Sequence, residues 1–129
     1  MLEGFEPVTP LRGRPSLSVT NAGLVFSRNV MQRMGRDSYI VFLINRAEKK
    51  IAIQKGDERD ERAIRAFHGS NPTRINNMDI DKIIADMMQW DTKSSLHYYH
   101  IDGEYIPSEK AIIFDLKMAK EKIKRRRNK

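Results

Sequence analysis

Apolar and polar residues alternate in several short stretches of the chain, and this period of two predicts a mainly β-structured protein. Ser16 to Val19 alternates polar and apolar side chains, and Leu24 to Phe26 follows as a second short strand. Tyr39 to Ile44 is a continuous run of β-forming residues, which predicts a strand buried on both faces. Ile51 to Gln54 follows a charged connection, so it is expected to pair with that strand as a hairpin.

A helical period interrupts this pattern twice. Ser27 is a suitable N-cap for a short helix of about two turns that presents Val30, Met31 and Met34 on one face, and Gly35 is placed to end it. A second and clearer amphipathic helix is expected to begin at Asp79. Its apolar face consists of residues at helical spacing, which we expect to pack into a core: Ile80, Ile83, Ile84, Met87 and Met88.

The order of these elements recurs along the chain. Ala63 to His68 and Thr73 to Asn76 are expected strands before the second helix, and Leu96 to Ile101 is expected to lead through a turn at Asp102-Gly103 to a return strand at Ala111 to Phe114. The predicted organisation is therefore an N-terminal arm (1–14), a first strand–helix–hairpin copy (15–55), a charged link (56–62), a second copy (63–116) and a basic C-terminal helix (117–129).

Neither copy has enough apolar residues to bury a sheet face by itself. Two copies packed together solve that problem, so we expect one pseudo-symmetric body. The predicted fold class is α+β, mainly β: a small barrel-like body of exchanged hairpins, with two short helices and the basic C-terminal helix.

Charge is concentrated at the C-terminal end. The 129-residue chain has a formal net charge of +7, and the segment 117–129 contains eight basic residues opposed only by Glu121, which leaves the rest of the chain balanced. A clustered basic segment is typical of proteins that bind polyanions, above all nucleic acids, although a solvated helix end that aids solubility has the same composition. The chain has no cysteine, which excludes disulfides and thiolate zinc sites.

Targeting signals are not evident in the sequence. No apolar run approaches the roughly 20 residues of a membrane helix. Met1 to Pro15 lacks the basic start and apolar stretch of a signal peptide. We therefore expect a cytoplasmic protein without a membrane partner.

The segment Asn21 to Gln54 resembles the AbrB-like swapped-hairpin family, which includes transition-state regulators and MazE-type antitoxins. The resemblance lies in a turn glycine, a short apolar strand, a cap, a short helix that ends at a glycine, and a long hairpin: Ala22 to Ser27, Val30, Met34-Gly35, Tyr39 to Ile44 and Ile51 to Ile53. It implies that two hairpins interleave into one barrel-like body that binds DNA or a protein partner. For this sequence the resemblance implies that both copies lie in one chain, which is then a monomeric pseudo-dimer or forms a homodimer.

Arg12-Gly13-Arg14-Pro15 matches the core of the AT-hook motif. Glycine lets such a backbone lie on the floor of the minor groove, and the two arginines follow the narrow, electronegative groove of A·T-rich DNA. The alternative is an extended arm that leads into the first strand, with Pro15 fixing its entry.

We therefore expect a DNA-binding transcriptional regulator. The expected contacts come from the arm, from the surroundings of the first helix and from the tail: Arg12, Arg14, Arg28, Arg33, Arg36, Lys124, Arg125, Arg126 and Arg127. The alternative is a protein-binding module, such as an antitoxin or a mobile-element inhibitor that neutralises a protein partner.

An enzyme is not expected, because the sequence contains no glycine-rich phosphate loop, no nucleophile elbow and no spaced set of metal ligands. His97 and His100 are three residues apart on an expected strand, so their side chains point to opposite faces and do not share a metal. No cofactor is expected.

Overall fold

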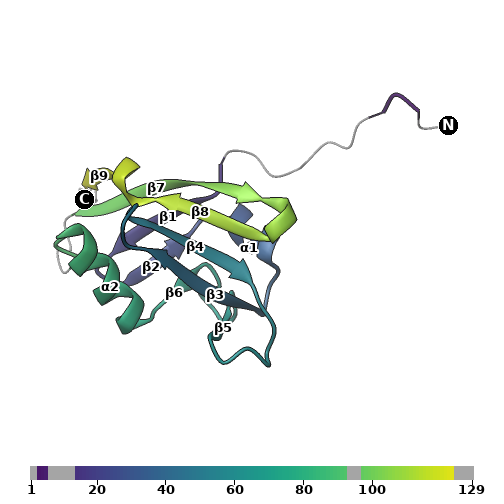
Figure 1. Ribbon diagram of the computed structural model, residues 1–129, viewed down its shortest axis with the longest axis horizontal. Helices are drawn as coiled ribbons and strands as arrows, with labels where there is room; N and C mark the ends of the chain where they lie inside the picture. The colour runs from purple at the N-terminus through teal and green to yellow at the C-terminus, as the bar shows by residue number, and fades with distance from the viewer. Residues whose placement is uncertain (1–2, 6–13, 93–96, 124–129) are drawn as a thin grey trace, which may run out of the picture.

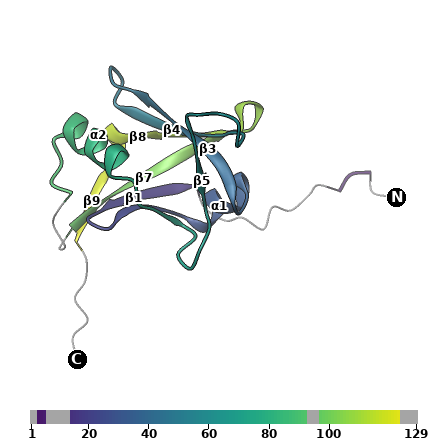
Figure 2. The ribbon, with the colours of Figure 1, turned by 90° about the horizontal axis from the view of Figure 1, so that it is seen from below.

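A computed structural model describes residues 3–5, 14–92 and 97–123, which form a single nearly closed, barrel-like sheet with two α-helices (Figures 1 and 2). The fold class is α+β and mainly β, as predicted. The elements in chain order are β1 (Ser16–Thr20), β2 (Gly23–Phe26), α1 (Arg28–Met34), β3 (Ser38–Asn45), β4 (Lys50–Lys55), β5 (Ala63–Ala66), β6 (Arg74–Ile75), α2 (Met78–Met88), β7 (His97–Ile106), the 3₁₀ turn η1 (Pro107–Glu109), β8 (Ala111–Asp115), the 3₁₀ turn η2 (Leu116–Met118) and β9 (Lys120–Ile123).

The strands of the two halves alternate within this sheet instead of forming separate units. Their order is β5-β3-β4-β8-β7-β1-β2-β6, with β9 beside β7. The β3–β4 hairpin of the first half pairs through β3 with β5 of the second half, and the β7–β8 hairpin pairs through β7 with β1 of the first half. Each half therefore places its long hairpin against the first strand of the other half.

The two hairpins are related by an approximate two-fold axis between β4 and β8, which pair antiparallel. The Lys55 N–H donates to the carbonyl oxygen of Lys110 (2.9 Å), and the Leu116 N–H donates to that of Lys49 (3.0 Å). Lys49 and Lys110 also occupy the same last position of their hairpin loops, with positive φ values of 54° and 49°. Lys49 and Lys110 are 61 positions apart in the sequence. The same separation relates three pairs of buried core residues: Ile40 and Ile101, Ile51 and Ile112, and Ile53 and Phe114.

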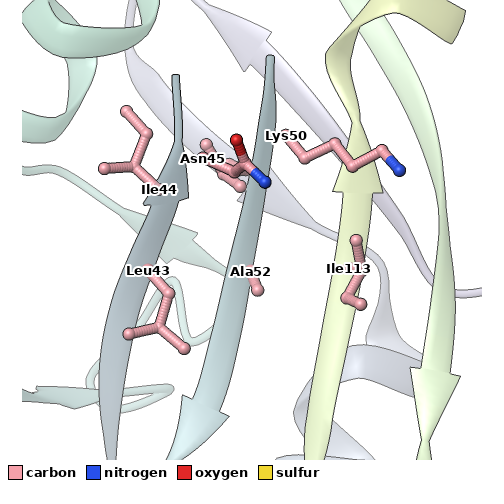
Figure 3. A pocket seen from close by; sticks show the side chains of 7 residues that line it. Leu43, Ile44, Asn45, Lys50, Ala52 and Ile113 are labelled. Atoms are coloured by element: carbon pink, nitrogen blue, oxygen red, sulfur yellow. The ribbon is translucent and has the colours of Figure 1, made fainter. Parts of the chain in front are cut away.

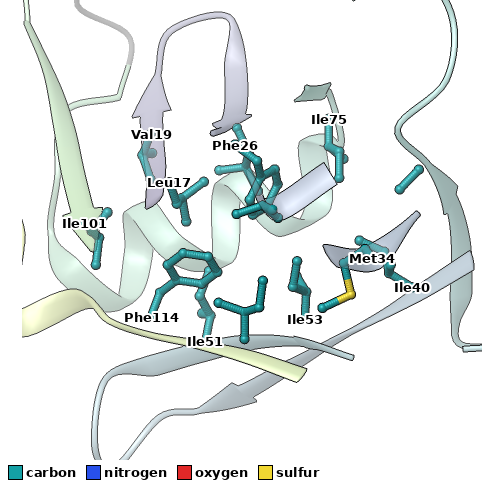
Figure 4. Packing of buried hydrophobic residues seen from close by; sticks show 14 of the residues in the cluster. Leu17, Val19, Phe26, Met34, Ile40, Ile51, Ile53, Ile75, Ile101 and Phe114 are labelled. Atoms are coloured by element: carbon teal, nitrogen blue, oxygen red, sulfur yellow. The ribbon is translucent and has the colours of Figure 1, made fainter. Parts of the chain in front are cut away.

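One continuous hydrophobic core fills the inside of the sheet (Figure 4). Phe26 lies at its centre, with its ring 5.9 Å from those of both Phe67 and Phe114 and 6.4 Å from that of Phe42. Those three neighbours come from β3, β8 and the end of β5, so a single side chain joins both halves. Pairs at such distances add to the stabilisation from burial alone.

Both helices begin at a residue suited to capping, but only the side chain that precedes α2 forms capping hydrogen bonds. The α2 cap is Asn77, whose Oδ1 accepts hydrogen bonds from the N–H groups of Asp79 (3.1 Å) and Ile80 (3.2 Å). The prediction of Asp79 as the cap was therefore wrong, because Asn77, two residues earlier, accepts hydrogen bonds from the free N–H groups of the first turn. Ser27 precedes α1, but its Oγ accepts from Ser16 N–H (3.0 Å) and so joins the helix start to β1.

The prediction of a turn at Asp102-Gly103 was wrong, because β7 runs through both residues to Ile106. The turn lies at Pro107–Glu109, where Lys110 closes the loop. Gly103 is required for packing: a Cβ atom there would lie 2.6 Å from Cε1 of Phe114. The glycine that suggested a turn therefore makes room for a core ring.

The predicted basic C-terminal helix is also not observed in the described part of the tail. After the single turn η2, Lys120–Ile123 form strand β9, which pairs with His97–His100 of β7. Lys and Glu alternate at these positions without a helical apolar face, and the open edge of β7 offers backbone partners. Residues 124–129 lie outside the described residues.

The strand at Tyr39 to Ile44 is not buried on both faces as predicted. Ile40 and Val41 are buried, but Leu43 and Ile44 are 39% and 41% exposed, because the end of the hairpin projects beyond the barrel. Leu43 lies in a row with Ala52 and Ile113 on the outer surface (Figure 3). This row lines a shallow hollow of about 170 Å³.

Within the described residues, no helix has the length and apolar character needed to cross a membrane.

Replacing Gly103 with alanine should destabilise the fold, because the new methyl group would overlap with Phe114 and Ile112. We expect a loss of about 1–3 kcal/mol in the free energy of unfolding. Chemical denaturation would measure this loss. Glu104→Ala, at the exposed next position of β7, is the control and should change little. Equal stability of the two variants would contradict the packing role of Gly103.

A fragment that ends at Gln54 should be largely unfolded by far-UV circular dichroism. It lacks β7, β5 and β8, which pair with β1, β3 and β4 in the whole chain. A cooperative thermal transition in a monomeric fragment would contradict the interdependence of the two halves. If the fragment instead folds as a homodimer, sedimentation will show it, and the second copy will have replaced the missing hairpin.

Candidate nucleic-acid interface

The outer face of the strands β6, β2, β1, β7 and β9 is a polar surface. Its central row is defined by the strand register, in which each residue lies opposite the next: Arg74, Val25, Ser18, His100 and Lys120. The alternate positions point inward, and Leu17, Val19 and Ile101 among them are buried. The period of two thus separates the core from a surface that carries basic and hydroxyl groups.

Neighbouring rows continue the same chemistry. Two positions before His100 on β7, Tyr98 lies opposite Lys122 of β9. Ser16 and Thr20 of β1 add hydroxyl groups on either side of Ser18. Lysine, arginine, serine, threonine and tyrosine side chains are among the groups that contact phosphate oxygens in protein–DNA complexes.

A hollow of about 370 Å³ borders this face where β1 and β9 flank β7. Arg14, two residues before the start of β1, lines it together with His100, Lys120 and Lys122. Arg14, Lys120 and Lys122 are exposed, so their charges are available to a ligand.

The two carboxylates in the same hollow each lie close to a side-chain nitrogen of a neighbouring residue. Asp102 Oδ1 lies 3.4 Å from Nε2 of His100, whose Nδ1 is 3.3 Å from Oγ of Ser18. Asp115 Oδ1 lies 3.0 Å from Nζ of Lys117. Burial acts to raise the pKa of Asp115, but the hydrogen bonds from Lys117 outweigh it, and the pKa lies below its ordinary value. The basic groups Arg14, Lys120 and Lys122 therefore dominate the hollow.

Arg33 lies in a second hollow, of about 530 Å³, which it lines with Arg14 and Tyr105. Its guanidinium carbon is 4.7 Å from the centre of the Tyr105 ring, a cation–π contact that orients the side chain. Its Nε is buried without a hydrogen-bond partner among the described residues. The structure thus brings two of the sequence-predicted residues together, since Arg14 borders both hollows.

The other two predicted arginines near the first helix do not line either hollow. Arg28 is the first residue of α1, and Arg36 follows Gly35 at its end; both are exposed. Next to Arg36, Asp37 forms a salt bridge with Arg65 (2.9 Å). Arg28 and Arg36 are therefore accessible without being organised around a common site.

Five of the predicted contact residues lie outside the described residues: Arg12, Lys124, Arg125, Arg126 and Arg127. Their neighbours are nevertheless placed. Arg12 precedes Arg14 by two residues, and Lys124 directly follows Ile123 of β9. The chain thus enters and leaves the described body at the two strands that flank β7.

Sequence reasoning missed Arg74, His100, Lys120 and Lys122 as members of one surface. The only available signal was the alternation from Lys120 to Ile123, which we interpreted as part of a helix. The pairing of β9 with β7 joins residues that are twenty or more positions apart in the sequence, so no local pattern indicates it.

His97 and the Trp90–Tyr99 pair lie away from the outer row of Arg74 to Lys120. His97 Nε2 lies 3.5 Å from Oε2 of Glu121, and His100 faces the opposite side of β7, as expected for residues three apart. Trp90 stacks on Tyr99 at 4.1 Å between ring centres and covers the end of the core. In the part of the chain that the structure describes, no group of three or more histidine, cysteine or acidic residues is arranged to hold a metal ion.

Comparison of the chain with protein-family models, with curated proteins and with solved structures finds no match.

Proposed function

We propose that the protein is a DNA-binding transcriptional regulator that contacts phosphates through the outer face of β6, β2, β1, β7 and β9. The observation that carries this proposal is the register row from Arg74 to Lys120, which places basic and hydroxyl groups on one side of the sheet. The exchange of hairpins between the two halves supports the further proposal that the chain is a single-chain relative of AbrB-like regulators.

The width of the face decides how it meets a duplex. Four intervals between five strands, at about 4.8 Å each, give roughly 19 Å from Arg74 to Lys120. The major groove is only about 12 Å wide. The sheet therefore lies across the phosphate backbones instead of entering the groove, and its contacts carry no direct sequence information.

Sequence selectivity then falls to the segments that adjoin the face. The arm reaches it at Arg14 and supplies Arg12, and the tail continues from β9 with Lys124 to Arg127. In this arrangement the arm reads the narrow minor groove of A·T-rich DNA, while the sheet and tail neutralise phosphates.

The phosphate contacts are tested with the double variant Lys120→Glu, Lys122→Glu in the full chain. Binding to a random-sequence duplex is measured by fluorescence anisotropy at several salt concentrations. Loss of two phosphate contacts should make the slope of log affinity against log salt shallower by about 2. The matched control, Lys55→Glu with Lys82→Glu, makes the same charge change at exposed positions of β4 and α2 and should keep most of the slope. Equal effects of the two pairs, or no DNA binding by the parent chain, would contradict the proposed face.

The role of the arm is tested with Arg12→Ala combined with Arg14→Ala. We expect the preference for A·T-rich over mixed-sequence duplexes to disappear, because groove width is what attracts these arginines. Arg28→Ala with Arg36→Ala should lower the affinity for both duplexes equally, since phosphates are common to all sequences. A lower melting temperature with an unchanged sequence preference would show that the arm packs on the body instead.

A further inference from the structure

The sheet remains open between its two end strands, β5 and β6, and this opening adjoins the proposed DNA interface, with which it shares Arg74. The two strands are the ends of the strand order and are not paired with each other. A hollow of about 380 Å³ lies between them, with Ile64 and Arg65 of β5 on one side and Arg74 and Ile75 of β6 on the other. We call this feature the seam.

Both walls of the seam are strand edges with backbone groups that point into it. The Gly56 N–H donates to the carbonyl oxygen of Tyr39, so the Tyr39 backbone is directed towards β4. Arg65, opposite Tyr39 on β5, therefore directs its own N–H and C=O away from β3 and into the seam. Across the seam, Phe26 N–H donates to Thr73 C=O, and by the same alternation the carbonyl group of Arg74 points away from β2.

The side chains of the seam combine an apolar floor with a basic rim. Phe67 and Ile75 are buried beneath it, and Ile64 is half-buried. Arg65 and Arg74 are exposed on opposite walls, and His68 lies between them on the connecting loop. Asp37 pairs with Arg65, but both side chains are more than half exposed, so this ion pair contributes little and is readily exchanged.

The opening belongs to the second half only. In the first half, β1 and β2 pair directly from Leu17–Phe26 to Thr20–Gly23. In the second half, the connection from β5 to β6 departs from strand geometry at Phe67 (φ 60°) and Gly69 (φ 79°), and the two strands do not meet. β1 and β2 of the first half thus pair with each other, whereas the facing edges of β5 and β6 remain available to a strand from outside the chain.

We propose that the seam binds an extended, acidic segment of a partner protein, which adds to the sheet as a strand between β5 and β6. Backbone hydrogen bonds to a free strand edge supply affinity in this mode of recognition, and side-chain pockets supply selectivity. The rim of Arg65, His68 and Arg74 selects acidic side chains, and the floor accepts the apolar residues that alternate with them.

The probe is a fluorescently labelled peptide of alternating glutamate and valine, seven residues long and blocked at both ends. Its binding to the full chain is measured by anisotropy. Arg74→Glu should weaken binding at least tenfold, because it places a carboxylate on the rim of the seam. The control Arg46→Glu makes the same charge change in the exposed loop between β3 and β4 and should bind the peptide like the parent chain. Circular dichroism confirms that both variants are folded.

Two further measurements separate strand addition from simple charge attraction. A peptide with proline in place of the central valine keeps its charge but cannot complete the strand, so it should bind at least tenfold more weakly. Hydrogen exchange should show protection of the Arg65 amide only when the unmodified peptide is bound.

Three results would overturn the proposal: equal binding of the proline peptide or of a lysine–valine counterpart, equal binding by the Arg74→Glu variant, or no protection at Arg65. Concentration-dependent self-association that protects the same amide without peptide would assign the seam to a second copy of the chain instead. None of these outcomes involves DNA, so they leave the proposed function to its own tests.

Discussion

The structure depends on one requirement: every backbone donor and acceptor at a buried strand edge needs a partner. Within one half, β1 and the β3–β4 hairpin provide no partner for each other. The exchange of hairpins between the halves gives both β1 and β3 a partner strand, since β1 pairs with β7 and β3 pairs with β5. The common core then follows, because strands interleaved in one sheet enclose one interior, with Phe26 in contact with rings from both halves.

The same exchange assembles the proposed interface from distant parts of the chain. Ser18 and Val25 come from the first half, whereas His100 and Lys120 come from the second half and the tail. The segment 117–129 carries the excess charge of the sequence, and its residues Lys120–Ile123 form a strand of the sheet instead of the expected helix. The short strand β9 thus joins the basic C-terminal segment to the outer face of the sheet.

Much of the fold could be predicted from local sequence. Short-range periodicity indicated both helices and the strands before them, because amphipathic spacing such as Ile80 and Ile84 depends only on neighbouring residues. The errors occurred where a distant partner decides the local structure. Gly103 lies within a strand, where its lack of a side chain leaves room for the Phe114 ring. Lys120 is in a strand because it pairs with β7. Of the candidate site, Arg14 and Arg33 were identified from sequence, whereas the register that unites Arg74 with Lys120 was not accessible to local patterns.

The exchange also determines when the protein can fold. As the chain is synthesised, β1 is complete long before β7, with which it must pair, and β3 is made before β5. Contacts between residues so far apart in sequence carry a large loop-closure cost and slow the folding of a domain. Until the second half emerges, the first half exposes apolar strands with open edges, the state in which proteins aggregate or recruit chaperones. A topology that joins two halves so closely in the native state therefore leaves the first half dependent on its surroundings during synthesis.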